Sequence, residues 1–392
     1  MSGQKSDGGS GRQAGLMPQP ANIQKDTSQS RVVCVQISIT PAGSPMKTCF
    51  KGGERLARST VRHLSAALCL WVCLCPLASH ALAQPGVFAE ITSPGNAAHD
   101  TPNSFNDGIG SVAYPYAIAT TEVTVAEWLT FVNAFAPHWT GEPEANGLVG
   151  RWIYSTGNGR YAAVTGSELF PADMSWRLAA RYANWLHNDR RTDAAAFASG
   201  AYDTSTFSAN GVTPYTDQLT RTPGARFWIP SRDEWFKAVY FDPSRFGPGQ
   251  PGYWLYPNAS DTPLQSGLPE EGGQTSAGIG FSAPNFGYLN VGAYPSTRSP
   301  WGLLDASGSE QEILEDSDPD RTIRVAMGSS RFDIVPFSTD HADTNLSGSA
   351  PFDYFTGGGL RIAAAVPGPS SALGLWIFGV WCCRRNSRKG KI

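Results

Sequence analysis

The stretch W-I-P-S-R-D-E-W-F-K-A-V, residues 228–239, predicts an extended entry, a sharp stop and a short helix. Pro230 disfavours helical conformation in the residue before it, so the chain enters extended. Ser231 is a favoured N-cap, and Glu234 lies three residues later, where its carboxylate can return to the cap amide and complete a capping box. A buried face follows at helical spacing, formed by Trp235, Ala238 and Val239.

The positions of the cysteines limit the chemistry that is available to the rest of the chain. All seven lie near the two ends, so residues 84–365 contain none: Cys34, Cys49, Cys69, Cys73, Cys75, Cys382 and Cys383. This excludes disulfides and thiolate chemistry from that interval, and a zinc site there would need His and carboxylate ligands. The 42 Gly and 29 Pro among 392 residues favour a fold rich in loops.

Charge is unevenly distributed along the chain. Residues 84–365 carry 16 Lys and Arg against 30 Asp and Glu, a net charge of −14, although the whole chain has a formal charge of only −3. The basic residues gather at the two ends. An acidic domain repels phosphate backbones, so nucleic-acid binding is not expected.

The N-terminal region predicts export. Residues 1–45 are rich in Gly, Ser, Gln and Pro without periodicity, which indicates disorder, and Met46 is the expected true start. Residues 46–83 then carry a positive region and an apolar run at 64–77, as in a Sec-type signal peptide. The alternative is a membrane anchor, but the run is shorter than the roughly 20 residues needed to span a bilayer. The cleavage site would be formed by Ala81 and Ala83 before Gln84.

The C-terminal region, residues 366–392, has a pattern of its own. The sequence V-P-G-P-S begins at Val366, Pro367 and Pro369, and is followed by an apolar run at 372–383 and a basic cluster. This order is typical of a C-terminal anchor with a positive stop. It resembles the PEP-CTERM sorting tail that exosortases process in Gram-negative bacteria, with Gly368 in place of the usual Glu. An unprocessed tail anchor is the alternative, and membrane contact is expected only through this tail.

The central stretch also resembles the motif R-L-P-[ST]-E-x-E-W-E-x-A-A of the formylglycine-generating enzyme family, whose members are also called sulfatase-modifying factor domains. Trp228 replaces the usual Arg, and Arg232 replaces the first Glu. Further partial matches follow the family's order at 121–128, 171–186, 256–257, 299–305, 308–313, 324–330 and 359–361. The resemblance covers roughly residues 112–365 and implies one α+β domain at 84–365, related to the C-type lectin fold, with small twisted sheets, few helices and much irregular loop.

Local patterns place the expected elements within this domain. Thr124 and Ser175 are N-caps of two further helices, with apolar residues at helical spacing behind each. Strands are expected within 90–101, 111–121, 323–326 and 359–365. Residues 190–225 are interpreted as a polar insertion, and 253–294 as long irregular loop.

The resemblance implies a chemistry that this chain lacks. Active family members oxidise a substrate cysteine with oxygen, through two cysteines that hold Cu(I) and follow the serine corresponding to Ser330. Cu(I) prefers soft thiolate ligands, whereas Asp333 and Ser338 stand at the corresponding positions here. Copper is therefore not an expected cofactor, and formylglycine formation is not an expected activity.

Other kinds of metal site are compatible with the sequence. Some relatives use non-heme iron through His ligands, and the domain has four His without ligand spacing, His99, His138, His187 and His341. The acidic run at 310–320 offers the oxygen ligands that calcium prefers. The resemblance implies a structural calcium ion there, with Ser309 at an Asn ligand position, Glu312 at the Glu position and Asp316 nearby. The alternative is a solvated acidic loop.

These observations lead to two functional hypotheses. The first is an exported, non-catalytic binding or structural module of the cell envelope or extracellular matrix. It would meet signal peptidase, an exosortase-type enzyme and a polysaccharide or protein ligand. The second is a metal-dependent oxidase using iron or copper. Aromatic residues in loop-like stretches could form a ligand platform or belong to the core, namely Trp139, Trp152, Tyr154, Tyr161, Trp254, Tyr256 and Tyr288.

Overall fold

The computed structural model describes residues 86–139, 148–333, 339–352 and 358–366. Within these ranges the fold is α+β, with four α-helices and small antiparallel sheets. The helices are α2 (Val125–Phe135), α3 (Trp176–His187), α4 (Ala194–Ala198) and α5 (Arg232–Tyr240). The predicted disordered segment 1–45, the predicted signal peptide with Ala81, Ala83 and Gln84, and the tail with Pro367 and Pro369 lie outside the described residues.

A four-stranded antiparallel sheet joins the beginning, middle and end of the described chain. Its order is β1 (Phe88–Ile91), β2 (Tyr116–Ala119), β11 (Ala363–Ala364) and β5 (Phe227–Trp228). Ala363 pairs with Ile118 on one side and with Trp228 on the other. The last strand is therefore hydrogen-bonded directly to the strand that opens the central stretch.

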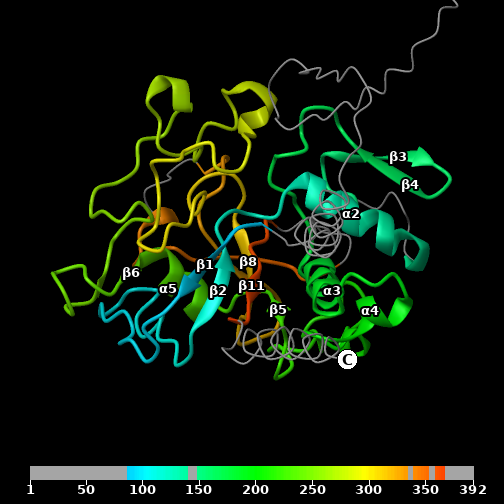
Figure 1. Ribbon diagram of the computed structural model, residues 1–392, viewed down its shortest axis with the longest axis horizontal. Coiled ribbons are helices and arrows are strands. Elements are labelled where there is room, and N and C mark those ends of the chain that lie inside the picture. Colours follow the sequence, from blue (N-terminus) through cyan, green and yellow to red (C-terminus); the bar gives the residue numbers. More distant parts are fainter. Residues whose placement is uncertain (1–85, 140–147, 334–338, 353–357, 367–392) are drawn as a thin grey trace, which may run out of the picture. The chain divides into compact units, whose positions relative to one another are not determined.

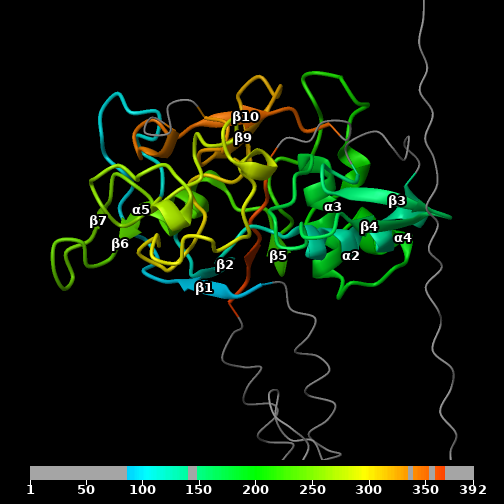
Figure 2. The same ribbon diagram turned by 90° about the horizontal axis from the view of Figure 1, so that it is seen from above.

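Three smaller sheets complete the strand content of these residues. One has the order β10 (Ser347–Ser349), β9 (Arg324–Met327) and β8 (Glu312–Ser317). The others are the hairpins β3 (Ile153–Gly157) with β4 (Arg160–Ala163), and β6 (Phe241–Asp242) with β7 (Gly252–Tyr253). In both ribbon views α2, α3, α4 and the β3–β4 hairpin gather on one side, whereas α5 and β6 lie on the other (Figures 1 and 2).

The predicted helix starts are confirmed. In α5 the Ser231 N–H donates to Glu234 Oε2 at 2.8 Å and the Glu234 N–H donates to Ser231 Oγ at 3.2 Å, which completes the capping box. Thr124 caps α2 by the same box with Glu127, and Ser175 caps α3 by accepting the Leu178 N–H. The cap residues thus fix where each apolar face begins.

An aromatic core forms where α2 and α3 meet. Phe131 of α2 contacts rings from both helices and from α4, namely Trp128, Phe135, Tyr182, Trp185 and Phe197. Ten of the twelve residues of α3 are buried because α4 and β5 cover its remaining faces. This helix is therefore enclosed on nearly every side.

Two polar segments contribute to the core. Residues 190–225, expected to be a polar insertion, place Tyr202 and Tyr215 in fully buried positions, and Asp217 binds Arg177 of α3 at 2.6 Å. Part of the acidic run is strand β8 rather than a solvated loop, since Glu312 and Glu315 are buried. Both segments have a polar composition, which on its own suggests exposure to solvent. Their charged side chains can nevertheless be buried because they have partners inside the fold.

The expectation of long irregular structure after residue 253 is confirmed. Residues 253–294 are mostly irregular and contain only the short 3₁₀ helices η3 (Pro269–Glu271) and η4 (Pro284–Gly287) after β7. Two further 3₁₀ helices are η1 (Ala136–His138) and η2 (Thr204–Thr206). Among the described residues, the helices are too short or too polar to span a membrane.

Candidate functional site

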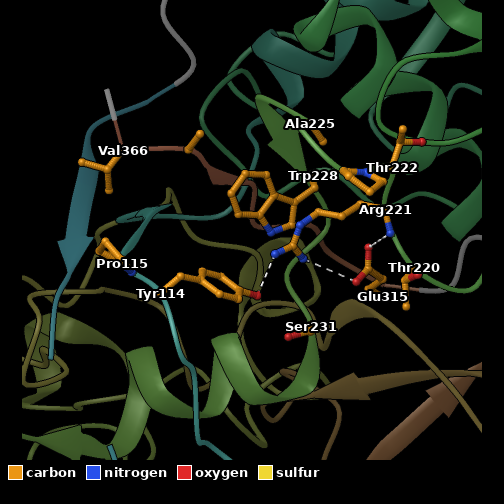
Figure 3. Close-up of a pocket in the computed structure, with 13 residues that line it drawn as sticks. Tyr114, Pro115, Thr220, Arg221, Thr222, Ala225, Trp228, Ser231, Glu315 and Val366 are labelled. Carbon is orange, nitrogen blue, oxygen red and sulfur yellow. Dashed lines mark hydrogen bonds and ion pairs between the residues drawn. The ribbon is translucent and has the colours of Figure 1, made fainter. Parts of the chain in front are cut away.

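An open cavity of about 560 Å³ lies beside the start of α5. Its volume falls within the range of roughly 300–1,000 Å³ that is usual for small-ligand sites. Aromatic rings, hydroxyl groups and charged groups face it, together with small apolar side chains (Figure 3). The lining residues are Tyr114, Pro115, Thr220, Arg221, Thr222, Pro223, Gly224, Ala225, Trp228, Ser231, Glu315, Ala365 and Val366.

Arg221 is the central side chain of this cavity. Its guanidinium carbon lies 4.2 Å from the ring centroid of Trp228 and 5.6 Å from that of Tyr114. Figure 3 shows the side chain crossing the face of Trp228 and reaching Tyr114, whose hydroxyl it contacts at 2.7 Å. Cation–π contact and the hydrogen bond together hold the guanidinium in one position.

Glu234 lies behind the cavity lining, at the first turn of α5, and is fully buried. Its Oε1 accepts from Tyr114 Oη at 2.9 Å and from Arg221 Nη2 at 2.8 Å. Its Oε2 accepts from the Ser231 N–H at 2.8 Å and from Trp228 Nε1 at 3.0 Å. The capping carboxylate of α5 is therefore also the counter-ion of Arg221, and all of its acceptor positions are engaged.

Glu315, on β8, is the second carboxylate at Arg221. Its Oε1 accepts from Tyr202 Oη at 2.9 Å and from the Arg221 backbone N–H at 2.6 Å. Among the described residues, its Oε2 has one polar contact, with Arg221 Nη1 at 3.5 Å, which is too long for a good hydrogen bond. Burial is the main cause that raises the pKa of Glu315 to about 7, while Arg221 opposes the shift.

The other family-like motifs converge on a separate, enclosed cluster. Arg361 binds Glu312 through Nη2 at 2.6 Å and Nε at 3.0 Å, and Trp235 Nε1 donates to the same carboxylate at 2.6 Å. All three side chains are essentially inaccessible to solvent. We call Trp235, Glu312, Arg361 and the neighbouring Glu122 the motif hub. It ties α5, β8 and the segment before β11 together.

Glu122 is the unusual member of the motif hub. It is buried, and neither of its carboxylate oxygens has a hydrogen-bond partner among the described residues. Burial, and secondly the charge of Glu312, raise its pKa well above the usual value. A protonated Glu122 therefore fits this environment better than an ionised one.

The residues predicted to hold calcium do not gather at one point. Glu312 binds Arg361 and Trp235, whereas Asp316 Oδ2 accepts the Arg232 N–H at 2.6 Å. Ser309 donates its N–H to Ser276 Oγ at 2.7 Å. No three His, Cys, Asp or Glu side chains within the described ranges are placed to hold a metal ion together. These contacts do not fit a shared ion, and a calcium site stays a prediction.

Two of the four histidines approach one carboxylate. His99 Nε2 lies 2.7 Å from Asp343 Oδ1, and His341 Nδ1 lies 3.7 Å from Asp343 Oδ2. His138 contacts the Thr192 carbonyl, and His187 accepts the Arg226 N–H, so they lie elsewhere. The His99 and Asp343 side chains are hydrogen-bonded to each other directly. His341 Nδ1 also accepts the Asp343 N–H at 3.2 Å.

The positions that correspond to the copper ligands are only partly described. The Ser330 N–H donates to the Asp333 carboxylate, which closes a short turn. Ser338 lies outside the described residues. The structure therefore gives Asp333 a local structural contact.

Most of the predicted aromatic platform belongs to the core. Tyr256 and Tyr288 are buried, and Trp139, Trp152, Tyr161 and Trp254 are half-buried. Tyr154 alone among the seven is exposed. The cavity instead uses Tyr114, which is 42% exposed, and Trp228.

The sequence analysis missed Arg221, Tyr114 and the role of Glu315. Two signals could have indicated them: Arg221 is one of few basic residues in an acidic domain, and it precedes a Pro-Gly turn at 223–224. The contact between 114 and 221 spans 107 residues and cannot be read from local patterns.

Comparisons with known proteins give little further information. No family model matches the chain, and no curated protein matches it. Among the solved structures that match is Treponema denticola variable protein 1, at 15% identity over 71% of this chain and 95% of that chain, with a TM-score of 0.40. This likeness is too low to support an inference about fold or function.

Proposed function

We propose that this chain is an exported, non-catalytic binding module of the cell envelope or extracellular matrix, with the fold of the formylglycine-generating enzyme family and its C-type lectin relatives. The ligand site is the cavity around Arg221, and an envelope polysaccharide is the proposed ligand. The proposal includes export by a Sec-type signal peptide and sorting through the C-terminal tail by an exosortase-type enzyme of a Gram-negative bacterium.

The observation that carries this proposal is the cavity itself. A fixed guanidinium, an exposed tyrosine face and several hydroxyl groups surround an open space of about 560 Å³. Polar groups held in place beside an aromatic face suit a hydroxylated ligand. Tyr114 and Arg221 lie on loops but are hydrogen-bonded to each other and to Glu234 of α5, so these groups are already positioned before a ligand binds.

The sequence supports the non-catalytic part of the proposal. No Cys lies within 84–365, so the domain cannot supply the two thiolates that the family's copper chemistry requires. The described motif residues Trp235, Glu312 and Arg361 are enclosed and bind one another. Their role in this proposal is to hold the fold.

The position of the cavity also suits an anchored protein. Ala365 and Val366 line it, and the proposed sorting tail begins at Val366. The ligand would therefore bind next to the point where the domain joins its anchor. An envelope polysaccharide is a ligand that is present at such a position.

Binding to immobilised polysaccharides tests the proposal directly. Thr222→Trp places a large ring at the exposed rim of the cavity, whereas Thr156→Trp makes the same change on the exposed β3–β4 hairpin. We expect the wild type and T156W to bind the same polysaccharides and T222W to lose that binding. Binding that T222W leaves unchanged, or no polysaccharide bound at all, would contradict the proposal.

The second candidate function is the metal-dependent oxidase, and the approach of His99 and His341 to Asp343 is the observation in its favour. Metal analysis of the purified protein by mass spectrometry separates the two candidates. The binding module predicts no stoichiometric iron or copper. About one iron or copper per chain would make the oxidase the better account, and calcium with a melting temperature that falls in chelator would identify a structural ion.

A further inference from the structure

Arg221 lies beside two carboxylates, so the group as a whole is not a neutral one-to-one ion pair. Arg221 carries one positive charge and contacts two carboxylates, Glu234 at 2.8 Å and Glu315 at 3.5 Å. Glu234 is saturated by the four donors described above, so it forms the primary pair with Arg221. Glu315 is left with one weakly engaged oxygen, Oε2, and its charge is not balanced within the cavity.

No other charged side chain lines the cavity. Besides Arg221 and Glu315, its lining residues are neutral. Arg324 lies on the far side of Glu315 and donates to its backbone carbonyl and to the carbonyls of Gln218 and Leu219. Tyr202, which also faces Glu315, donates a neutral hydroxyl. The cavity therefore offers, at its wall, a weakly engaged carboxylate that is ionised from about neutral pH upward.

The groups around this acceptor suit a sugar ring. The exposed face of Tyr114 can stack on the C–H face of a pyranose. Thr220, Thr222 and Ser231 supply hydroxyl groups on the walls. The domain as a whole carries a net charge of −14 over 84–365, which attracts a polycation over long distances.

We propose that the cavity binds an amino sugar with a free, protonated amine, whose ammonium group donates to Glu315 Oε2 while Tyr114 contacts the ring. This rests on the proposed polysaccharide-binding function and names the class of sugar. The ammonium supplies the positive charge that Glu315 lacks, and a charge-assisted hydrogen bond of this kind is stronger than one from a sugar hydroxyl. An N-acetylated sugar at the same place would have neither the charge nor the ammonium donors.

The proposal implies a definite pH dependence. Burial raises the pKa of Glu315 to about 7, so the carboxylate takes up a proton as the pH falls below neutrality and then cannot accept the ammonium. At higher pH the amine loses its own proton. Binding should therefore be strongest near neutral pH and weaken on both sides.

Calorimetric titration of the purified full chain with two matched ligands tests this inference. The ligands are a β-1,4-linked glucosamine tetramer and the N-acetylglucosamine tetramer of the same length. We expect the amine tetramer to bind at least tenfold more tightly at pH 7. Glu315→Gln should weaken the amine tetramer at least tenfold and leave the N-acetylated tetramer unchanged.

The Gln variant keeps an oxygen that can accept from Tyr202 and from the Arg221 N–H, and its melting temperature serves as the control for folding. Equal binding of both tetramers, unaffected by E315Q, would overturn the amine inference and leave polysaccharide binding intact. Binding of neither tetramer would also overturn it. In that case the polysaccharide panel with T222W decides separately whether the cavity binds a sugar at all.

Discussion

The motif hub and the cavity are built from the same groups, yet they differ in what they can do. Each contains one arginine, one tryptophan indole N–H that donates to a glutamate, and a second glutamate nearby. In each, the arginine balances only one of the two carboxylates. The hub members are Arg361, Trp235, Glu312 and Glu122, and the cavity members are Arg221, Trp228, Glu234 and Glu315.

Solvent access separates the two clusters. The second carboxylate of the hub, Glu122, is enclosed and has no hydrogen-bond partner in the part of the chain that the structure describes, so burial favours its protonated form. The second carboxylate of the cavity, Glu315, lines an open space and can meet a ligand. An unbalanced carboxylate is thus a structural feature when it is enclosed and a binding group when a cavity opens onto it.

The largest expected effect is on stability, from breaking the ion pair of the hub. Glu312→Ala leaves the guanidinium of Arg361 buried without its counter-ion, and removing one partner of such a pair costs about 3–5 kcal/mol. Urea unfolding measures this loss. The matched control is Asp189→Ala at the exposed Arg226–Asp189 pair, where about 0.2–1 kcal/mol is expected. Equal losses at the two sites would contradict a structural role for the hub.

A smaller loss of stability is expected when a methyl group is added beside the motif hub, at Gly359. A Cβ at Gly359 would lie 2.6 Å from Glu122 Oε1 and 3.0 Å from Glu310 Cβ. Gly359→Ala should therefore cost about 1–3 kcal/mol. Adding Glu122→Ala should recover part of that loss, because it removes the closer of the two contacts, and a double-mutant cycle measures the coupling. If the two changes in the free energy of unfolding were strictly additive, the side chains at 122 and 359 would not be in contact.

The hub should also make stability depend on pH. The folded state keeps a proton on Glu122 that the unfolded state releases above its ordinary pKa of 4.5, so the free energy of unfolding falls as pH rises above that value. The slope is at most about 1.4 kcal/mol per pH unit for one proton. Asp305, Arg361, Glu310 and Glu312 are the charged groups that face it.

Glu122→Gln cannot titrate, so urea unfolding at pH 5 and pH 8 should differ less in the variant than in the wild type. At pH 8 the variant should be the more stable protein. The matched control is Glu90→Gln, on the exposed side of β1, which should leave the difference between the two pH values unchanged. An unaltered pH dependence in E122Q would show that Glu122 is ionised in the folded protein.

The smallest effect on stability is expected in the cavity. Glu315→Gln should change the free energy of unfolding at pH 6 by less than about 1 kcal/mol, because the wild-type residue, with a pKa of about 7, is mostly protonated there. The contrast with E312A separates a binding carboxylate from a structural one on the same strand, β8. A loss as large as that of E312A would show that Glu315 is needed for stability and would contradict a role mainly in binding.

The local part of this fold was accessible from sequence. Ser231, Thr124 and Ser175 mark helix starts because a cap hydroxyl and the following apolar spacing act within a few residues. The α+β class, which the family resemblance implied, is confirmed by the helices and small antiparallel sheets of the described residues. Glu312 was recognised as a motif residue, but its partner, Arg361, lies 49 residues away.

The candidate site was not accessible in the same way. The composition of residues 310–320, which is rich in charged side chains, favours a solvated surface. Only the long-range contacts of the folded chain show that Glu312 and Glu315 are buried on β8. The cavity needs Tyr114, Arg221 and Glu315 to meet across 94 to 107 residues. No spacing rule connects such positions, because tertiary packing alone determines their distance.

The two tryptophan indole N–H groups allow the most direct test of the contrast between hub and cavity. Trp228 Nε1 donates to Glu234 beside the cavity, and Trp235 Nε1 donates to Glu312 within the hub. Their signals in a ¹H–¹⁵N spectrum, assigned with Trp228→Phe and Trp235→Phe, would be followed while the glucosamine tetramer is added. A saturating shift of the Trp228 signal with an unmoved Trp235 signal is the predicted result. An unmoved Trp228 signal on ligand binding would contradict the assignment of this cavity as the ligand site.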